Sequence, residues 1–271
     1  MEKKKLSDFV GFFNVVMFAP EDLNLVKGSP QVRRRFLDME LVQTNPTYLY
    51  HLNQYNQVLT QRNQLLKNTQ TSRDHEVLNI WNEQLVDFGT KIMLKRHQFV
   101  QELEVWARKL HHEMTRGLEH FSMVYQPSIP VAQLTEDRIK ADFMVKLKQV
   151  EKQETMRGVT LLGPHRDELT FQVNGMDVQT FGSQGQQRTT ALSLKLAEIE
   201  FIRQQVGEYP VLLLDDVMSE LDPMRQEQLF GMVYEKVQTF ITTTHLDAVY
   251  AKFPSNASQN IYVENGRCAA N

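Results

Sequence analysis

Residues 181–222 read FGSQGQQRTTALSLKLAEIEFIRQQVGEYPVLLLDDVMSELD, and this stretch decides the fold. It opens with a turn at residues 182–187 that contains two glycines and leads into a long helical pattern. A helix N-terminus presents unpaired backbone N–H groups and the positive end of the helix dipole, so the serine and the glycine placed there suit a phosphate. The turn therefore predicts a phosphate contact, although the same residues are also typical of an ordinary helix start.

An apolar run at residues 211–214 follows the helical pattern and ends in Asp215 and Asp216. A continuous aliphatic run of this length, opened by Pro210, is typical of a strand buried in a parallel sheet. Carboxylates at the C-terminal end of such a strand face the crevice where ligands bind, so one can hold Mg²⁺ while the next orients a water. Taken without context, the two aspartates are equally typical of an N-cap with a solvated neighbour. Residues 219–223 then lead into another helix, with an aspartate as N-cap and a proline at its first position.

The order and spacing of these signals resemble the second half of an ABC-type ATPase head. In that resemblance residues 183–187 are the signature motif, residues 211–216 the Walker B strand and residues 219–222 the D-loop. More narrowly, SQGQQRT at residues 183–189 together with LDDV at residues 214–217 is similar to the RecF family of bacterial recombination mediators. Further matches lie at residues 18–23, 33–38 and 163–167, so the resemblance covers nearly the whole chain.

The resemblance implies roles for particular side chains in an ATP-closed homodimer. ATP is expected to contact Ser183, Gly185, Gln186 and Asp222. Asp215 is expected to bind Mg²⁺, and Asp216 is expected to orient the attacking water. His245 is expected to contact the γ-phosphate. Such dimers hold each nucleotide between Walker B of one subunit and the signature of the other, so Ser183 and Gly185 are expected to act in trans. Outside this resemblance, a histidine after a strand is usually an ordinary loop residue. ABC enzymes more often carry glutamate at the position of Asp216, and the shorter aspartate favours slow hydrolysis.

No stretch of the chain matches the phosphate-binding loop G-x-x-x-x-G-K-[ST], which holds nucleotide phosphates through backbone N–H groups and a lysine. The nearest glycine spacing, Gly158 to Gly163, is followed by proline and histidine. Proteins of the RecF family carry the loop in an N-terminal portion, and Met1 aligns with an internal position of the family. We therefore expect a fragment, a split or shortened gene product, or an isolated domain. On this expectation the chain by itself neither binds nor hydrolyses ATP with useful affinity, because ATP and Mg²⁺ both need the missing loop.

Composition limits the class of protein. With 271 residues, 41% hydrophobic and 23% charged, the chain can bury a sizeable core and is expected to form two structural units. A net charge of −3 argues against a generally basic nucleic-acid binder, so any DNA contact must come from local patches. The single cysteine, Cys268, rules out an intrachain disulfide and favours a reducing, cytoplasmic setting. No apolar run reaches the roughly 20 residues of a membrane span.

The fold class predicted from these patterns is α/β, an incomplete ABC-ATPase head with a P-loop NTPase-like sheet. The head is expected at residues 1–29 and 158–271, interrupted by an inserted antiparallel helical arm at residues 30–157. Within the later head part, a strand is expected at residues 159–162, followed by a β-hairpin of residues 168–173 and 176–181. The hairpin prediction rests on an intervening Asn-Gly turn.

The arm is predicted from heptad spacing, since Leu78, Leu85, Ile92, Phe99 and Trp106 recur every seven residues. Around residues 95–103 the buried face shifts, so we expect the first half of this long helix to pack on the preceding helix. The second half is expected to pack on a third helix through Ile139, Phe143, Leu147 and Val150. Its basic side chains either form a solvated face or line a groove for DNA; they are Arg96, Arg108, Lys109, Lys140, Lys146 and Lys148.

Three consecutive arginines, Arg33, Arg34 and Arg35, start a helix after the turn at residues 27–30. Such a triplet is normally a solvated helix face. The family resemblance favours a phosphate or DNA contact instead, and it favours the same role for Arg166 in the turn after the strand expected at residues 159–162.

The resemblance implies ATP-dependent binding of single-stranded and gapped DNA in recombinational repair, replication restart and SOS induction. RecR and RecO are the implied direct partners, and loading of RecA at single-strand gaps is the implied outcome. A different class stays open, namely a non-enzymatic DNA-binding or interaction module with a degenerate ATPase fold. A transporter head is disfavoured, because transporter heads carry a far shorter helical insertion.

Overall fold

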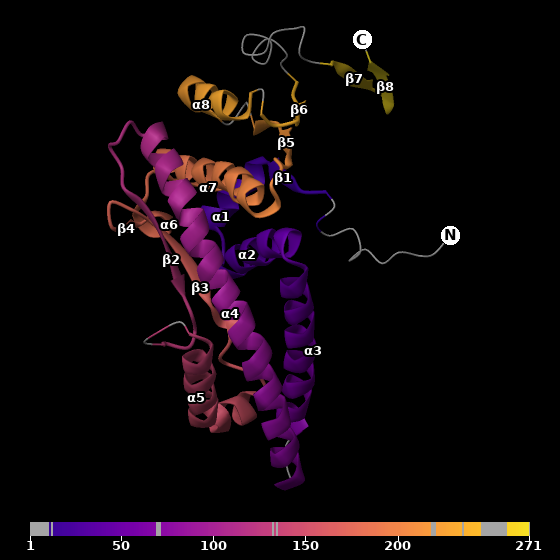
Figure 1. Ribbon diagram of the computed structural model, residues 1–271, viewed down its shortest axis with the longest axis vertical. Helices are drawn as coiled ribbons and strands as arrows, with labels where there is room; N and C mark the ends of the chain where they lie inside the picture. The colour runs from indigo at the N-terminus through magenta and orange to yellow at the C-terminus, as the bar shows by residue number, and fades with distance from the viewer. Residues whose placement is uncertain are drawn as a thin grey trace.

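Three parallel strands lie at one end of the molecule and form one sheet (Figure 1). β5 (Val211–Asp215) is central, between β1 (Val15–Phe18) and β6 (Thr239–Thr242). Figure 1 shows this sheet at one end of an elongated α/β molecule and a helical arm at the other. This computed structural model describes residues 11, 13–68, 72–131, 133, 135–217, 221–234, 236–244 and 259–270.

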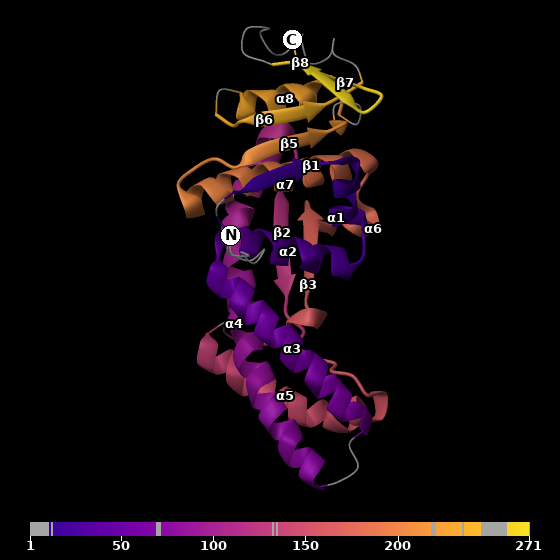
Figure 2. The same cartoon turned by 90° about the vertical axis from the view of Figure 1, so that its right-hand side faces the viewer.

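One face of the sheet packs on the long helix α7 (Gln184–Val206), which lies beneath it in Figure 2. Leu212 and Leu214 of β5 are almost fully buried. Phe18 pairs with Leu214 and lies against α7, because the Nζ atom of Lys195 on α7 is 6.0 Å from the centre of the Phe18 ring. The aliphatic run therefore forms the buried parallel strand that the sequence predicts. Helix α7 is a central buried helix, since residues from Gln187 to Ile202 are buried on nearly every side.

The arm consists of α3 (Pro46–Asn68), α4 (Ser72–Met114) and α5 (Glu136–Arg157). Helices α3 and α4 run antiparallel along the arm (Figure 1). Leu78, Leu85 and Ile92 are at most 1% exposed, so the heptad spacing marks a buried seam as predicted.

The second half of α4 packs on α7, and the prediction that it packs on a third helix is wrong. The rings of Phe99 and Phe201 meet edge to face with their centres 4.8 Å apart. Helix α5 lies instead against the first half of α4, where a Cβ atom on Gly89 would stand 2.8 Å from the ring of Phe143. The shift of the apolar face at residues 95–103 thus marks a change of packing partner, but the pattern does not say which helix comes next.

A second, antiparallel sheet has the order β2 (Phe121–Gln126), β3 (Glu168–Val173) and β4 (Met176–Asp177). The predicted Asn-Gly turn joins β3 to β4, and Asn174 and Gly175 both have positive φ, at 52° and 77°. The expected second strand ends after two residues, because Asp177 accepts a hydrogen bond from the Thr180 N–H and caps the short helix α6 (Val178–Phe181). β2 pairs a segment of the predicted arm with β3, and the domain boundaries at 30 and 158 stay a prediction.

Residues 159–162 do not form the expected strand. Two of their backbone N–H groups donate to side chains of the arm, Thr160 to Asn63 Oδ1 and Leu161 to Glu154 Oε1, each at 2.7 Å. The Glu154 carboxylate also binds the fully buried guanidinium of Arg62 at 2.6 Å. Hydrogen bonds to these polar side chains therefore replace a sheet ladder at the base of α5.

The remaining helices and strands of the described residues are short, apart from α2 and α8. They are η2 (Pro20–Asp22), α1 (Leu23–Lys27), α2 (Pro30–Thr44), η3 (Pro164–Arg166), α8 (Pro223–Val233), β7 (Ile261–Glu264) and β8 (Arg267–Ala270). None of the helices in the described part of the chain has both the length and the apolar character needed to cross a lipid bilayer.

Candidate nucleotide site

The signature turn is a fully formed capping box at the start of α7. The Ser183 hydroxyl accepts a hydrogen bond from the Gln186 N–H at 3.2 Å, and Gln186 Oε1 accepts one from the Ser183 N–H at 2.9 Å. Gly182 is fixed by packing, because a Cβ atom there would stand 2.5 Å from the carbonyl oxygen of Val178. The turn is thus held by its own sequence, with Ser183 and Gly185 exposed.

Gly185 has no such constraint within the chain. A Cβ atom at this position would meet only ordinary contacts, Arg225 Nη2 at 3.7 Å and Ser183 Oγ at 3.8 Å. Packing therefore does not explain the glycine. An open glycine at the N-terminus of a helix allows an anion to approach the backbone closely.

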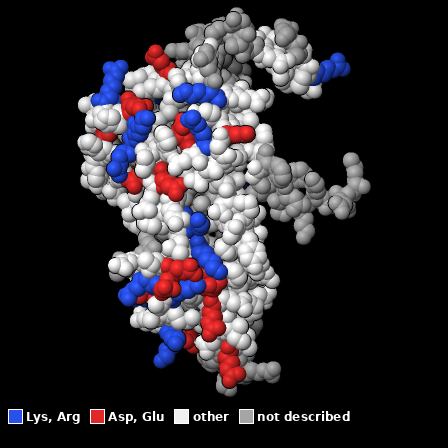
Figure 3. All heavy atoms as spheres, viewed as in Figure 1, with Lys and Arg blue, Asp and Glu red and all other residues white. Residues whose placement is uncertain are grey.

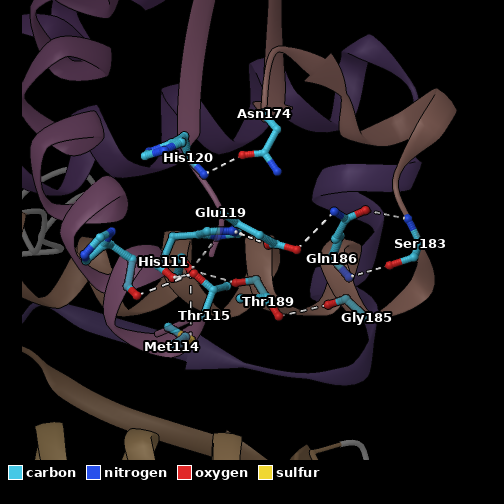
Figure 4. Close-up of polar contacts among 12 residues, drawn as sticks. His111, Met114, Thr115, Glu119, His120, Asn174, Ser183, Gly185, Gln186 and Thr189 are labelled. Carbon is cyan, nitrogen blue, oxygen red and sulfur yellow. Dashed lines mark hydrogen bonds and ion pairs between the residues drawn. The ribbon is translucent and has the colours of Figure 1, made fainter. Parts of the chain in front are cut away.

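Gln186 links the signature turn to the end of the arm helix (Figure 4). Its Nε2 atom donates to Glu119 Oε1 at 3.0 Å, and Glu119 Oε2 lies 2.9 Å from Nε2 of the fully buried His111. Burial lowers the pKa of His111, and it does so against the hydrogen bond and the charge of Glu119, which raise it. Because a carboxylate only accepts, the neutral ring presents its Nε2–H to Glu119.

Asp215 and Asp216 lie at the C-terminal end of β5, as expected, and Thr242 of β6 contacts both. The Thr242 hydroxyl donates to Asp215 Oδ1 at 2.6 Å and lies 3.3 Å from the Asp216 backbone N–H, a contact in which it accepts. Asp216 has a φ of 50°, in the left-handed region that non-glycine residues seldom adopt and that aspartate tolerates better than most. Both carboxylates are exposed, with Asp215 oriented by the hydroxyl.

Asp222 of the D-loop is joined to the signature by Arg225. The Asp222 carboxylate caps α8 by accepting from the Arg225 N–H at 3.0 Å, and it also pairs with the Arg225 guanidinium. Nη2 of the same guanidinium donates to the Gly185 carbonyl at 3.1 Å and to Thr189 Oγ1 at 2.6 Å. Burial raises the pKa of Asp222, but the backbone N–H and the guanidinium of Arg225 outweigh it, so the net pKa lies below its ordinary value.

A buried cluster of charges lies beside the end of β1. Lys195 of α7 binds Glu198 Oε2 at 2.6 Å, and Asp22 and Glu40 approach the same ammonium. Burial raises the pKa of Glu40 to about 7, although the charge of Lys195 lowers it. Burial also raises the pKa of Asp22, against the charge of Lys195 and a hydrogen bond from the Ala19 N–H. Three carboxylates thus share one lysine beside the loop that follows β1.

The four arginines expected to contact DNA have different surroundings. Arg33 is buried and forms a bidentate ion pair with Glu168 at 2.8 and 3.0 Å, so its guanidinium joins α2 to β3. Arg34 is half-buried and donates to the Asp167 carbonyl at 2.8 Å, whereas Arg35 and Arg166 are exposed. On the face drawn in Figure 3, basic side chains are interleaved with acidic ones and form no continuous basic field. The DNA contact stays a prediction for the three arginines that are not buried.

Arg96 was expected on the solvated face of the arm or along a groove for DNA, and that expectation is wrong. It is 2% exposed and donates to Asp38 Oδ1 at 2.8 Å and to the Pro164 carbonyl at 2.6 Å. Its hydrogen-bonding groups are occupied within the fold.

Mg²⁺ usually binds through one or two carboxylates together with phosphate oxygens and water. The exposed carboxylate of Asp215 fits that donor set. Across the described residues, no group of three or more His, Cys, Asp or Glu side chains gathers around a common point. His245, the expected γ-phosphate contact, lies outside the described residues, as do Ser219 and Glu220 of the D-loop.

Four residues of this site were not predicted. Thr242 and Arg225 follow from local signals, namely a threonine run ending the last parallel strand and an arginine three residues after an aspartate N-cap. Lys195 stands out as a charge within an otherwise apolar helical pattern. Glu119 has no comparable signal, because its partner Gln186 is 67 residues away in the sequence.

The parallel order of the sheet and the helix that carries the signature place the protein in the class of ABC-type ATPase heads. No known family model matches the sequence. The DNA replication and repair protein RecF of Bacillus cytotoxicus is 54% identical over 267 residues, which is 98% of this chain and 71% of that protein. RecF of Bacillus thuringiensis is also 54% identical, over 98% of this chain and 72% of its own length.

Solved structures agree with these relatives. Two structures of the recombination mediator protein RecF in the RecFOR pathway, one of them with ATP, superpose with a TM-score of 0.87. They are 32% identical to this chain and cover 98% of it and 70% of their own length. The chain belongs to the RecF family.

Proposed function

We propose that the protein acts as a RecF-type recombination mediator in DNA replication and repair, in the cytoplasm. The observation that carries the proposal is the linkage of Gly185 to Asp222 through Arg225, which holds the signature and the D-loop of one chain as a unit. Such a unit suits presentation to a nucleotide held by a second subunit. The 54% identity to RecF proteins over 98% of the chain supports the same function.

ATP and Mg²⁺ are the proposed cofactors. Asp215 holds Mg²⁺, Asp216 orients the attacking water, and His245 contacts the γ-phosphate. Ser183, Gly185, Gln186 and Asp222 contact ATP bound to the partner subunit. Mg²⁺ supplies the positive charge that stabilises the phosphoryl group in the transition state. The sequence contains no phosphate-binding loop, so we propose that this chain by itself does not hydrolyse ATP.

The proposed outcome is binding of single-stranded and gapped DNA by an ATP-closed homodimer. With RecR and RecO this dimer assists the loading of RecA at gaps, and so contributes to replication restart and SOS induction. The relatives support the pathway, because the solved structures are described as belonging to the RecFOR pathway. A net charge of −3 is in keeping with DNA contact through a local patch.

The test is MgATP binding and turnover by this chain alone, and again after addition of a separately expressed N-terminal portion of a RecF relative. Turnover is expected only on addition, and it should vanish in an Asp216→Asn variant. This substitution keeps the shape of the side chain and removes the charge that orients water.

The second candidate is a non-enzymatic DNA-binding module, favoured for this chain by the absence of the phosphate-binding loop motif from its sequence. DNA binding without nucleotide, together with no turnover after addition of the N-terminal portion, would replace the ATPase proposal with this one.

A further inference from the structure

A hollow of about 650 Å³ lies where α2 and α3 meet at the base of the arm. We call it the α2–α3 hollow; its floor is Tyr55, Arg96 and His165, and its walls include Arg34, Arg35 and Met39. None of the residues assigned to the nucleotide site lines it. Its volume is within the range of sites that hold a small ligand or a few residues of a peptide.

The floor of the hollow carries no net charge. The guanidinium of Arg96 is neutralised by Asp38, which also accepts a hydrogen bond from the Tyr48 hydroxyl at 2.5 Å. The Nε2 atom of His165 faces the Thr160 carbonyl at 3.2 Å, so it carries the proton, and Nδ1 accepts from the Tyr55 hydroxyl at 2.6 Å. Burial lowers the pKa of His165 to about 4, so the ring is neutral at physiological pH.

The wall, in contrast, carries two positive charges. Arg34 is half-buried and donates through Nη1 to a backbone carbonyl, which leaves its charge without a carboxylate bound to it. Arg35 is exposed, and no carboxylate of the described residues forms an ion pair with it. Burial lowers the pKa of Arg34, and the neighbouring charges of Arg96 and Arg166 lower it further against that of Glu168. An anion placed at this wall would meet two cations, beside the Asp38 carboxylate that Arg96 already neutralises.

An apolar strip runs beside the two arginines. Met39 is 53% exposed, and Val42 and Leu52 are half-buried on facing sides of the hollow. Met39 is flexible and polarisable, a property that suits contact with varied aliphatic side chains. The hollow therefore combines a basic wall with an adjacent apolar surface.

We propose that the α2–α3 hollow binds an acidic, aliphatic peptide segment of a partner protein. Its carboxylate pairs with Arg34 and Arg35, and its aliphatic side chain lies against Met39, Val42 and Leu52. Charge complementarity supports this occupant, since Arg guanidinium groups bind carboxylates through paired hydrogen bonds.

Nucleic acid fits the same hollow less well. Base stacking needs an exposed aromatic ring. Of the two rings that line the hollow, Tyr55 is 1% exposed, and the half-buried ring of His165 is fixed by hydrogen bonds at both nitrogens. A phosphate would make no contact with the apolar strip of Met39, Val42 and Leu52. The combination of charge and apolar surface thus favours peptide over the DNA contact predicted for the same arginines.

The test is fluorescence anisotropy with the whole chain and three labelled probes. These are a peptide of alternating aspartate and leucine, a peptide of alternating aspartate and serine, and a mixed-sequence single strand of DNA. The variants are Arg35→Glu, which reverses an exposed charge, and Met39→Ser, which removes the apolar wall. Lys152→Glu is the matched control, because Lys152 is exposed on α5 and does not line the hollow.

The aspartate–leucine peptide is expected to bind best, and each hollow variant should weaken its binding about tenfold or more, whereas Lys152→Glu should leave it unchanged. Absence of binding, or binding that neither hollow variant weakens, overturns the proposal. Preference for the DNA strand, lost in Arg35→Glu and kept in Met39→Ser, overturns it in favour of a nucleic-acid contact. No ATP enters the measurement, so the peptide result does not depend on the nucleotide site proposed above.

Discussion

The side-chain amide of Gln186 donates a hydrogen bond to Glu119 over 3.0 Å, and this contact ties the signature turn to the segment after the arm helix α4. Glu119 is held from its other side by the buried His111, 2.9 Å away. The second half of α4 also packs along α7, the helix that the signature turn begins. The arm helix α4 is therefore connected to the signature turn in two ways, by side-chain packing on α7 and by the Glu119 carboxylate.

Replacement Glu119→Ala should loosen the signature turn. The substitution removes the acceptor of Gln186 and the partner of His111, and loss of a hydrogen bond to a charged group typically costs about 1.5–3 kcal/mol. We expect faster amide hydrogen exchange at residues 183–187 in the isolated chain. Glu113→Ala serves as control, because Glu113 is exposed on α4. Unchanged exchange at these amides would show that the capping box alone holds the turn.

Arg225→Lys should separate the D-loop from the signature while leaving α8 in place. Lysine keeps the positive charge but cannot reproduce the fork with which Arg225 contacts Gly185, Thr189 and Asp222 together. The Asp222 cap remains, so circular dichroism should report the same helix content. The free energy of unfolding should fall by about 1–2 kcal/mol, measured by urea denaturation. A lysine variant as stable as the parent would contradict a role for the fork.

Stability should depend on the protonation of His165. The pKa of His165 is about 4 in the folded chain, whereas its ordinary value, which applies to the unfolded chain, is 6.5. Between these pH values the unfolded chain therefore binds more protons than the folded chain. The contribution of His165 is therefore complete above pH 6.5 and is lost as pH falls toward 4, by about 3 kcal/mol. Glu40, with its pKa raised to about 7, acts in the opposite direction, because its contribution is lost as pH rises from 4.5 to 7.

The two effects are separated by comparing the parent chain with His165→Gln across this range of pH. The difference in unfolding free energy between the two proteins should shrink as pH falls, since glutamine does not titrate. His112→Gln, at an exposed position of α4, is the control and should leave the slope unchanged. A parallel pH dependence of the parent and His165→Gln would exclude His165 as the titrating group.

Local patterns predicted the parts of the fold that depend on neighbours in sequence. The aliphatic run of β5, the apolar surface of α7 and the Asn174-Gly175 turn each specify their own conformation. The helix start at Ser183 belongs to the same group, because the capping partner of Ser183 is three residues away.

Side-chain partners distant in the sequence were not predictable in this way. Arg33 and Arg96 look like ordinary surface charges in a helical pattern, whereas Arg62 stands at a position of the apolar stripe between Leu59 and Leu66. Each of the three is buried against a carboxylate. Arg62 and Glu154 lie 92 residues apart, and the charge of a residue does not indicate which distant element will neutralise it. For the same reason the packing of α4 on α7 was missed, because an apolar stripe is compatible with any apolar partner.

Gly185→Ala is expected to stabilise the chain and to impair the proposed nucleotide function. The fold leaves room for a Cβ atom at this position, and replacing glycine by alanine in a helix typically stabilises by about 0.5–1 kcal/mol. Urea denaturation should therefore show a small gain in stability. In the assembly restored with an N-terminal portion of RecF, the same variant should lose ATP turnover, because the added methyl group blocks the close approach of a phosphate to the helix N-terminus.

Two other glycines provide matched comparisons for this prediction. Gly231 lies within α8 and a Cβ atom there meets nothing within 4 Å, so Gly231→Ala should stabilise the chain equally and leave turnover intact. Gly182→Ala should destabilise it, since the new Cβ atom would stand 2.5 Å from the Val178 carbonyl. Full turnover in a stabilised Gly185→Ala assembly would mean that no ligand approaches this glycine, and the signature turn would then be only the start of a helix.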